Sequence, residues 1–86
     1  METIKIKLNS TQDMIRFNKR ITKYDCDFDL EVGHNYVDAK SLLGLYSLSL
    51  HQPMLLHIQA DPLMADEIRE DLLEFCCEAD AVVCGV

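Results

Sequence analysis

The sequence predicts an α+β fold in which three helices cover one face of a four-stranded antiparallel sheet. Four short segments alternate apolar with polar residues, which is the pattern of strands with one buried and one solvated face. Three other segments repeat apolar residues at helical spacing, so each needs an apolar surface to pack on. The order along the 86 residues is strand, helix, strand, strand, helix, strand, helix. We expect a single domain over residues 1–86, because a chain of this length builds one hydrophobic core.

The first half of the chain contains one strand, one helix and a pair of strands. Isoleucine or leucine alternates with lysine over residues 4–8, which predicts the first strand. Ser10 begins an S-x-x-D capping box that ends at Asp13 and starts a helix. Residues 26–32 and 36–39 are the next two strands, with a turn at Gly33-His34-Asn35 between them. The apolar residues of the helix are Met14, Phe17, Ile21 and Tyr24.

The middle of the chain predicts a short helix followed by the fourth strand. Ser41 is suited to cap a helix over residues 42–48, and Gly44 weakens this helix locally. The Gln52-Pro53 dipeptide predicts a break in the regular secondary structure. The apolar alternation of residues 54–60 then predicts a strand.

The last helix has the clearest start signal of the chain. Asp61 followed by Pro62 is an N-cap with proline at the first helical position. Residues 78–86 have no clear period, so we expect them to be a frayed tail. The predicted buried stripe of the helix consists of Ala65, Ile68, Leu72, Phe75 and Cys76.

The net charge of −7 is unevenly distributed along the chain. Residues 1–40 carry seven basic and seven acidic side chains, whereas residues 41–86 carry Arg69 and eight carboxylates. Binding to nucleic acid needs a positive surface, so we expect no direct nucleic-acid contact. No apolar run approaches the ~18 residues that span a bilayer, and the N-terminal residues alternate instead of forming a signal-peptide core. These observations predict a cytoplasmic protein without a membrane contact, whose partners are proteins.

Neither the cysteines nor the histidines have the spacing of a metal or catalytic site. Cys76 and Cys77 are adjacent, which suits neither a disulfide between them nor the C-x-x-C spacing of zinc sites. His34, His51 and His57 fall in a turn, a loop and a strand, and we interpret all three as structural or incidental. No phosphate-binding or dinucleotide-binding fingerprint is present, so we expect no cofactor, no metal and no enzymatic activity. We expect reduced thiols at Cys26, Cys76, Cys77 and Cys84.

Residues 37–50 read VDAKSLLGLYSLSL and carry the most informative pattern of the chain. They match a pattern of roughly V-N-x-K-S-I-M-G-x-M-S-L at Val37, Ala39-Lys40-Ser41, Gly44 and Ser47-Leu48. That pattern belongs to the regulatory-serine segment of the histidine-containing phosphocarrier (HPr) family of the bacterial sugar phosphotransferase system. The chain resembles this family. The resemblance extends from residue 4 to about residue 77, and it implies an open-faced β-sandwich with three helices on one face.

The chain departs from the family pattern at one loop. Family members that carry phosphate have a G-I-H-A-R-P sequence after the first strand, in which the histidine takes the phosphoryl group and the arginine steadies it. The equivalent loop here contains no histidine, arginine or proline. The resemblance therefore implies that phosphohistidine transfer by the usual route is lost. This degenerate phosphocarrier loop consists of Asn9, Ser10, Thr11, Gln12 and Asp13.

Ser41 has two interpretations. Its hydroxyl oxygen can accept a hydrogen bond from an amide of the first helical turn, so an ordinary N-cap explains it without any modification. The same hydroxyl can carry a phosphate, which would meet the positive end of the helix dipole. The resemblance implies the second interpretation, because in the HPr family this serine is the target of an ATP-dependent kinase.

The segment that follows Ser41 has more apolar residues than one helix face can bury. One face can dock on the sheet, and the other is either covered by neighbouring loops or exposed as an interaction surface. By resemblance, Leu42, Leu43 and Tyr46 fall where the family contacts its enzymes and transcriptional partners, and we place Lys40 with them. The apolar residues of the segment are Leu42, Leu43, Leu45, Tyr46, Leu48 and Leu50.

A basic stripe on the first helix also has two interpretations. It is either a solvated helix face or a docking strip that speeds association with an acidic protein surface. The last helix has an acidic face, which we interpret as serving solubility. The basic stripe consists of Arg16, Lys19, Arg20 and Lys23.

We therefore hypothesise a regulatory and protein-interaction domain of the HPr type, switched by phosphorylation of Ser41. Its expected partners are phosphotransferase-system enzymes, a serine kinase or a transcriptional regulator, and we expect a monomer. One alternative is a phosphocarrier that uses a non-standard site, such as Ser10 or Thr11. The other is an interaction domain that works without any phosphorylation.

Overall fold

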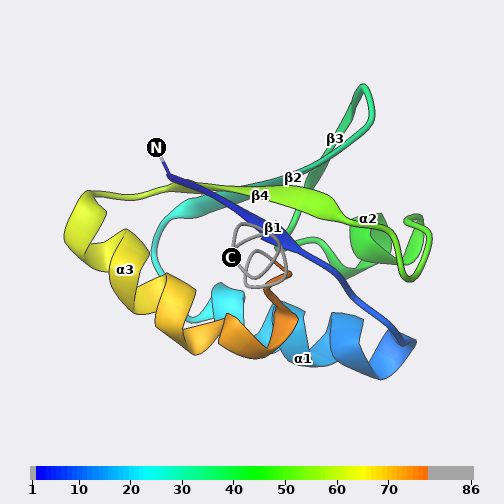
Figure 1. Ribbon diagram of the computed structural model, residues 1–86, viewed down its shortest axis with the longest axis horizontal. Helices are drawn as coiled ribbons and strands as arrows, with labels where there is room; N and C mark the ends of the chain where they lie inside the picture. Colours follow the sequence, from blue (N-terminus) through cyan, green and yellow to red (C-terminus); the bar gives the residue numbers. More distant parts are fainter. Residues whose placement is uncertain (1, 78–86) are drawn as a thin grey trace, which may run out of the picture.

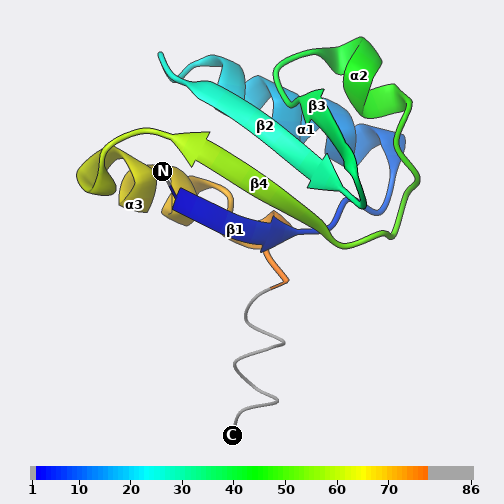
Figure 2. The same ribbon diagram turned by 90° about the horizontal axis from the view of Figure 1, so that it is seen from above.

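The computed structural model describes residues 2–77, so the expectations for residues 78–86, including Cys84, lie outside the described part. The predicted fold class is confirmed. Four antiparallel strands form one sheet in the order β1-β4-β2-β3, so β1 and β3 are its edge strands (Figure 2). The strands are β1 (Glu2–Ile6), β2 (Asp27–Val32), β3 (Asn35–Asp38) and β4 (Met54–Gln59).

The helices lie on one side of this sheet. Figure 1 shows α1 and α3 below the strands, with α2 at the end of the sheet where the β2–β3 hairpin projects upward. Within residues 2–77 the opposite face of the sheet carries no helix, which is the open-faced arrangement that was expected. The helices are α1 (Thr11–Thr22), α2 (Leu42–Tyr46) and α3 (Pro62–Asp71), and a 3₁₀ turn, η1 (Leu73–Phe75), follows α3.

Each helix begins at the polar residue that the sequence predicts. Ser10 Oγ accepts a hydrogen bond from the Asp13 amide at 3.0 Å, and Asp61 Oδ1 accepts one from the Met64 amide at 2.8 Å. Ser41 Oγ likewise caps α2, as described below. The Asp13 carboxylate departs slightly from the capping-box pattern, because it accepts a hydrogen bond from the Asn9 amide, one residue before the cap.

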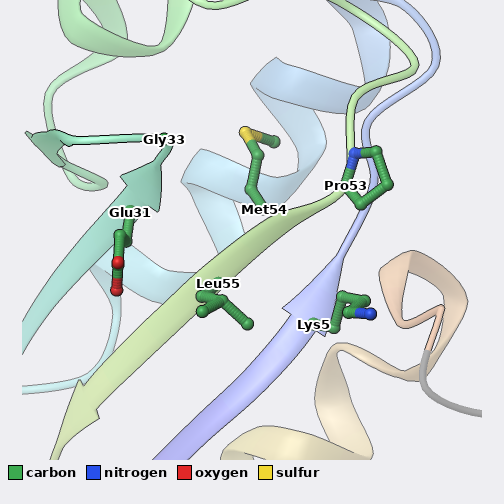
Figure 3. A pocket seen from close by; sticks show the side chains of 6 residues that line it. All are labelled: Lys5, Glu31, Gly33, Pro53, Met54 and Leu55. Atoms are coloured by element: carbon green, nitrogen blue, oxygen red, sulfur yellow. The ribbon is translucent and has the colours of Figure 1, made fainter.

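The core lies between the sheet and the helices. The inward apolar residues of β1 and β4 are buried, as are Phe28 and Leu30 of β2 and most of the apolar stripes of α1 and α3, as the alternation and the helical spacing predict. Val32 and Tyr24 are partly buried and pack against this core. The outward residues Lys5, Leu55 and Glu31 stand side by side on β1, β4 and β2. They line a shallow hollow of about 250 Å³ on the open face (Figure 3). The three phenylalanines of the core are Phe17, Phe28 and Phe75.

The last helix is shorter than predicted. It ends at Asp71, and the predicted stripe continues through the 3₁₀ turn into an extended residue, Cys76. Cys76 pairs with Ile6 on the outer edge of β1. Two hydrogen bonds flank this pair, Lys7 N to Phe75 O and Cys77 N to Lys5 O, each 2.9 Å long. The helical spacing was misleading because this tertiary pairing requires an extended backbone.

Gly44 allows α2 to approach β3 closely. A methyl group at this position would lie 2.6 Å from Val37 Cγ1, and valine has little rotamer freedom with which to move away. Overpacking costs about 1 to 3 kcal/mol, and the better helix propensity of alanine offsets at most about 1 kcal/mol of it. We therefore expect Gly44→Ala to lower the free energy of unfolding, measured by urea denaturation.

A double-mutant cycle with Val37 distinguishes a steric clash from a backbone effect as the cause of the lost stability. Removal of the Val37 methyl groups in Val37→Ala should make Gly44→Ala much less costly. An equal cost in both backgrounds would contradict the steric explanation.

Candidate functional site

An exposed apolar surface surrounds α2, as the leucine excess predicts. Leu45 is fully buried in the core, whereas Leu43 is 83% exposed and Tyr46 is 46% exposed. Leu42 is half-buried and packs against the core. Neighbouring loops therefore leave part of the helix uncovered. We call Leu42, Leu43 and Tyr46 the α2 patch.

A groove continues the α2 patch toward the start of α1. Its volume is about 530 Å³, and Tyr46 belongs to both surfaces. One wall comes from the first two turns of α1 and the other from the chain that follows α2. The groove joins two segments that are far apart in the sequence, so the sequence alone could not indicate it. Its lining residues are Thr11, Met14, Ile15, Tyr46, Leu48 and Leu50.

Ser41 is exposed and caps α2 at the margin of the patch. Its Oγ accepts a hydrogen bond from the Gly44 amide at 3.2 Å, which confirms the N-cap interpretation. The preceding chain is held in place by Asn18, whose Nδ2 donates to the Lys40 carbonyl at 2.9 Å. The Ser41 hydroxyl therefore stands on a fixed backbone with its outer side in solvent.

Lys40 is engaged within the chain. Its ammonium donates to the Tyr24 carbonyl at 2.6 Å and lies 5.7 Å from the centre of the Phe28 ring. These contacts link the loop before α2 to the end of α1 and to β2. A contact between Lys40 and a partner stays a prediction, and a partner would have to draw the ammonium away from these neighbours.

The basic stripe of α1 faces acidic residues at the end of α3 and in η1. Both Arg16 and Arg20 form ion pairs with Glu74, and Lys23 Nζ lies 2.8 Å from an Asp71 carboxylate oxygen. Asp71 and Glu74, two carboxylates of the acidic face that was expected to serve solubility, therefore link α1 to the end of α3 and to η1 instead. Lys19 is exposed. A partner's carboxylate would have to compete with Glu74 for the two arginines.

Tyr24 completes this cluster. Its hydroxyl donates a hydrogen bond of 2.7 Å to the Asp71 carboxylate. Burial, together with this bond, raises the pKa of Tyr24 from 10.0 to about 12. Hydrogen bonds from Lys23 and Tyr24 lower the pKa of the Asp71 carboxyl. The neutral phenol and the charged carboxylate are thus the forms that stabilise the folded chain.

The Tyr24 shift predicts a loss of stability at alkaline pH. Because the pKa is higher in the folded chain, the stabilisation is complete below pH 10 and is lost as the pH rises toward about 12. Denaturation midpoints should therefore fall more steeply over this range in the wild type than in Tyr24→Phe. Tyr46→Phe, which removes an exposed hydroxyl elsewhere, is the control and should follow the wild type. Parallel curves for the wild type and Tyr24→Phe would contradict the assignment.

The degenerate loop forms the N-terminal end of α1, and it has a neighbour that sequence reasoning missed. The His51 amide donates to the Leu8 carbonyl at 2.8 Å, and His51 Nδ1 lies 3.1 Å from Asn9 Oδ1. The loop before β4 therefore brings an imidazole to Asn9. No local pattern signals this contact, because the two residues are 42 positions apart. Ser10, Thr11, Gln12 and Asp13 follow Asn9 as the cap and first turn of α1.

The other two histidines differ from His51. His57 lies on the open face of the sheet, with Nε2 2.7 Å from Glu31 Oε1 and Nδ1 3.1 Å from Thr3 Oγ1. His34 lies exposed in the turn that follows Gly33, whose φ is +61°. Among residues 2–77, no three His, Cys, Asp or Glu side chains converge as metal ligands. The three cysteines of this part are free thiols.

Comparisons with known proteins identify the fold. No family model and no curated protein matches the sequence. Among solved structures, HPr-C-His from Thermoanaerobacter tengcongensis is similar, with a TM-score of 0.69, 22% identity, and coverage of 86% of this chain and 92% of that chain. A phosphocarrier protein HPr from Bacillus anthracis str. Ames has a TM-score of 0.67 and 16% identity, covering 87% of this chain and 95% of that one. The chain therefore has an HPr-like fold.

Within residues 2–77, none of the helices has both the length and the apolar character that crossing a bilayer requires.

Proposed function

We propose that this chain is a regulatory and protein-interaction module related to the sugar phosphotransferase system, without enzymatic activity of its own. It acts in the bacterial cytoplasm and binds proteins of that system, or a transcriptional regulator, through the α2 patch and the adjoining groove. The observation that carries the proposal is the uncovered apolar surface around Leu43 and Tyr46 on an HPr-like fold.

The chemistry of this surface suits a protein partner. Leucine and tyrosine side chains release water when they are covered, and tyrosine is enriched among the residues that dominate interface energies. The groove beside them offers an apolar recess for a partner's side chain. Thr11 at the groove and the exposed Ser41, which precedes Leu42 of the α2 patch, can form part of the solvated rim that such interfaces have.

Ser41 is the proposed switch of this surface. Its hydroxyl is exposed, and a phosphate there would add up to about two negative charges beside the α2 patch. The added charge would favour a partner with an arginine or lysine at this margin and oppose an acidic or apolar one. Phosphorylation would thus exchange one class of partner for another without rebuilding the fold.

Incubation with an HPr-type serine kinase and ATP tests this switch. We expect intact-mass measurement to show one added phosphate that is absent in Ser41→Ala. Ser47→Ala is the matched control, because Ser47 closes the same helix and its hydroxyl donates to the Gly44 carbonyl. It should be phosphorylated like the wild type. An unchanged mass, or a phosphate that persists in Ser41→Ala, would remove the switch from the proposal.

A further inference from the structure

The open face of the sheet carries its negative charge on the side of β2 and β3. Side chains alternate along a strand, so every second residue of these two strands points away from the core. All of these outward residues are carboxylates except Tyr36. Figure 1 shows the β2–β3 hairpin rising above the sheet, away from α1 and α3. We call the following residues the acidic face: Asp27, Asp29, Glu31, Tyr36 and Asp38.

Two carboxylates of the acidic face repel each other. Asp29 and Asp38 lie directly opposite on neighbouring strands, where like charges destabilise a sheet. Each accepts one neutral hydrogen bond, Asp29 Oδ2 from the Gln59 amide at 3.2 Å and Asp38 Oδ1 from the Lys40 backbone amide at 3.0 Å. Within residues 2–77, no lysine or arginine forms an ion pair with either carboxylate. A cation brought by another molecule would therefore relieve this repulsion.

Tyr36 adds an aromatic surface beside these carboxylates. It is 63% exposed, and its ring centre lies 5.9 Å from that of His57. The charge of Glu31, directly opposite on β2, is the main cause that raises the pKa of Tyr36. A guanidinium can stack on such a ring and pair with carboxylates at the same time, whereas an ammonium is a compact and strongly hydrated charge. The combination therefore suits arginine better than lysine.

The hollow on the open face lies next to the hairpin and extends the acidic face. Figure 3 shows Leu55 between Glu31 and Lys5 on the floor of this hollow of about 250 Å³. Leu55 can contact the methylene groups of a long side chain, while Glu31 attracts its charged end. Lys5 lies on the β1 side, so the attraction for a cation is directed toward β2 and β3.

We propose that the acidic face binds a segment of a partner protein that carries arginine side chains. One guanidinium stacks on Tyr36 and others lie beside Asp29 and Asp38. The inference goes beyond the proposed function and does not depend on it, because the α2 patch lies on a helix and the acidic face lies on the sheet.

Charge argues against two other occupants of the acidic face. Residues 78–86 contain acidic and no basic side chains, so they would add to the repulsion. A second copy would bring either the same acidic face or the basic stripe of α1. In that stripe Arg16, Arg20 and Lys23 are already paired with Glu74 and Asp71.

A titration of the isotope-labelled full chain with a hexa-arginine peptide at low salt tests the inference. We expect the largest amide NMR shifts in β2 and β3, and a dissociation constant that rises with salt. Asp29→Asn combined with Asp38→Asn keeps both hydrogen-bond acceptors and should weaken binding about five-fold, the loss of two exposed charge pairs. Glu67→Gln combined with Glu70→Gln is the matched control, because it removes the same charge from exposed positions of α3. It should weaken binding less than about two-fold.

A hexa-lysine peptide distinguishes stacking on Tyr36 from attraction between charges. The wild type should bind hexa-arginine about three-fold more tightly than hexa-lysine, and Tyr36→Leu should lose this preference. Tyr46→Leu, which changes an exposed tyrosine of α2, should keep it. Equal affinity of the wild type for the two peptides would show that arginine is not the recognised group.

The remaining outcomes decide whether the acidic face is a binding surface. Equal losses for the two double variants, shifts spread over α3, or no shifts at all would overturn the inference. Shifts of the acidic face that follow the concentration of the chain alone would identify a second copy as the occupant instead. Urea denaturation gives an independent check, because removal of the repulsion should raise the denaturation midpoint of Asp29→Asn with Asp38→Asn above that of the α3 control. A lower midpoint would contradict the repulsion.

Discussion

Phe75→Ala should lower the free energy of unfolding by about 3 to 5 kcal/mol, the cost of emptying a large aromatic site in a packed core. The Phe75 side chain is 3% exposed and meets the Phe17 ring edge-on, with ring centroids 5.7 Å apart. The guanidinium groups of Arg16 and Arg20 lie 5.6 and 5.4 Å from the centre of the ring. One truncation therefore removes the aromatic pair and both cation–π contacts between α1 and η1.

Leu73→Ala is the matched control, because it shortens a side chain in the same 3₁₀ turn that is 56% exposed. Leu73→Ala should change the free energy of unfolding by no more than about 0.5 kcal/mol. Urea denaturation followed by circular dichroism measures both variants. A loss for Phe75→Ala as small as that expected for Leu73→Ala would show that the turn contributes little to the core.

Tyr46→Asp should weaken binding to the general enzyme of the phosphotransferase system by roughly 30-fold or more, equivalent to about 2 kcal/mol. The substitution replaces an apolar contact with a charge that the interface would have to desolvate. Leu43→Asp should act in the same direction. Leu63→Asp is the matched control, since Leu63 is 84% exposed, like Leu43, but lies at the start of α3, away from α2 (Figure 2). Calorimetric titration gives the dissociation constants.

The control decides what a loss of affinity means. If Leu63→Asp weakens binding as much as Leu43→Asp, the effect comes from added negative charge and the α2 patch is not the docking surface. If Tyr46→Asp abolishes binding while Ser41→Ala has no effect with any partner, the interaction domain without phosphorylation is the better description.

Local signals predicted most of the fold. Ser10, Ser41 and Asp61 were identified as helix caps because a cap depends on one side chain and the three residues that follow it. The strands were predicted because alternation of apolar and polar residues directly indicates a strand with one buried and one solvated face. The exposed side of α2 was predicted because six apolar residues in ten exceed what one short helix can bury.

Contacts between distant segments were not predictable in this way. The sequence placed Arg16 and Glu74 on two separate charged faces, and only the packing of η1 against α1 brings them together. The early end of α3 depends on the pairing of Cys76 with Ile6, which has no pattern of its own. His51 was considered incidental because its neighbour Asn9 is brought to it by the fold. The spacing of residues along the chain predicts which side chains share a face of one helix or strand. These pairs join different elements, so they depend on the tertiary structure.

The short segment on the outer edge of β1 has a consequence for behaviour at high concentration. Uncovered strand edges invite other chains to add to them, which leads to aggregates and fibrils. Here residues 75–77 occupy the backbone groups of Lys5 and Lys7 on one edge. The opposite edge is β3, which is only four residues long. Concentrated solutions of the folded chain should therefore resist edge-to-edge stacking, and the protection should disappear once the 3₁₀ turn detaches.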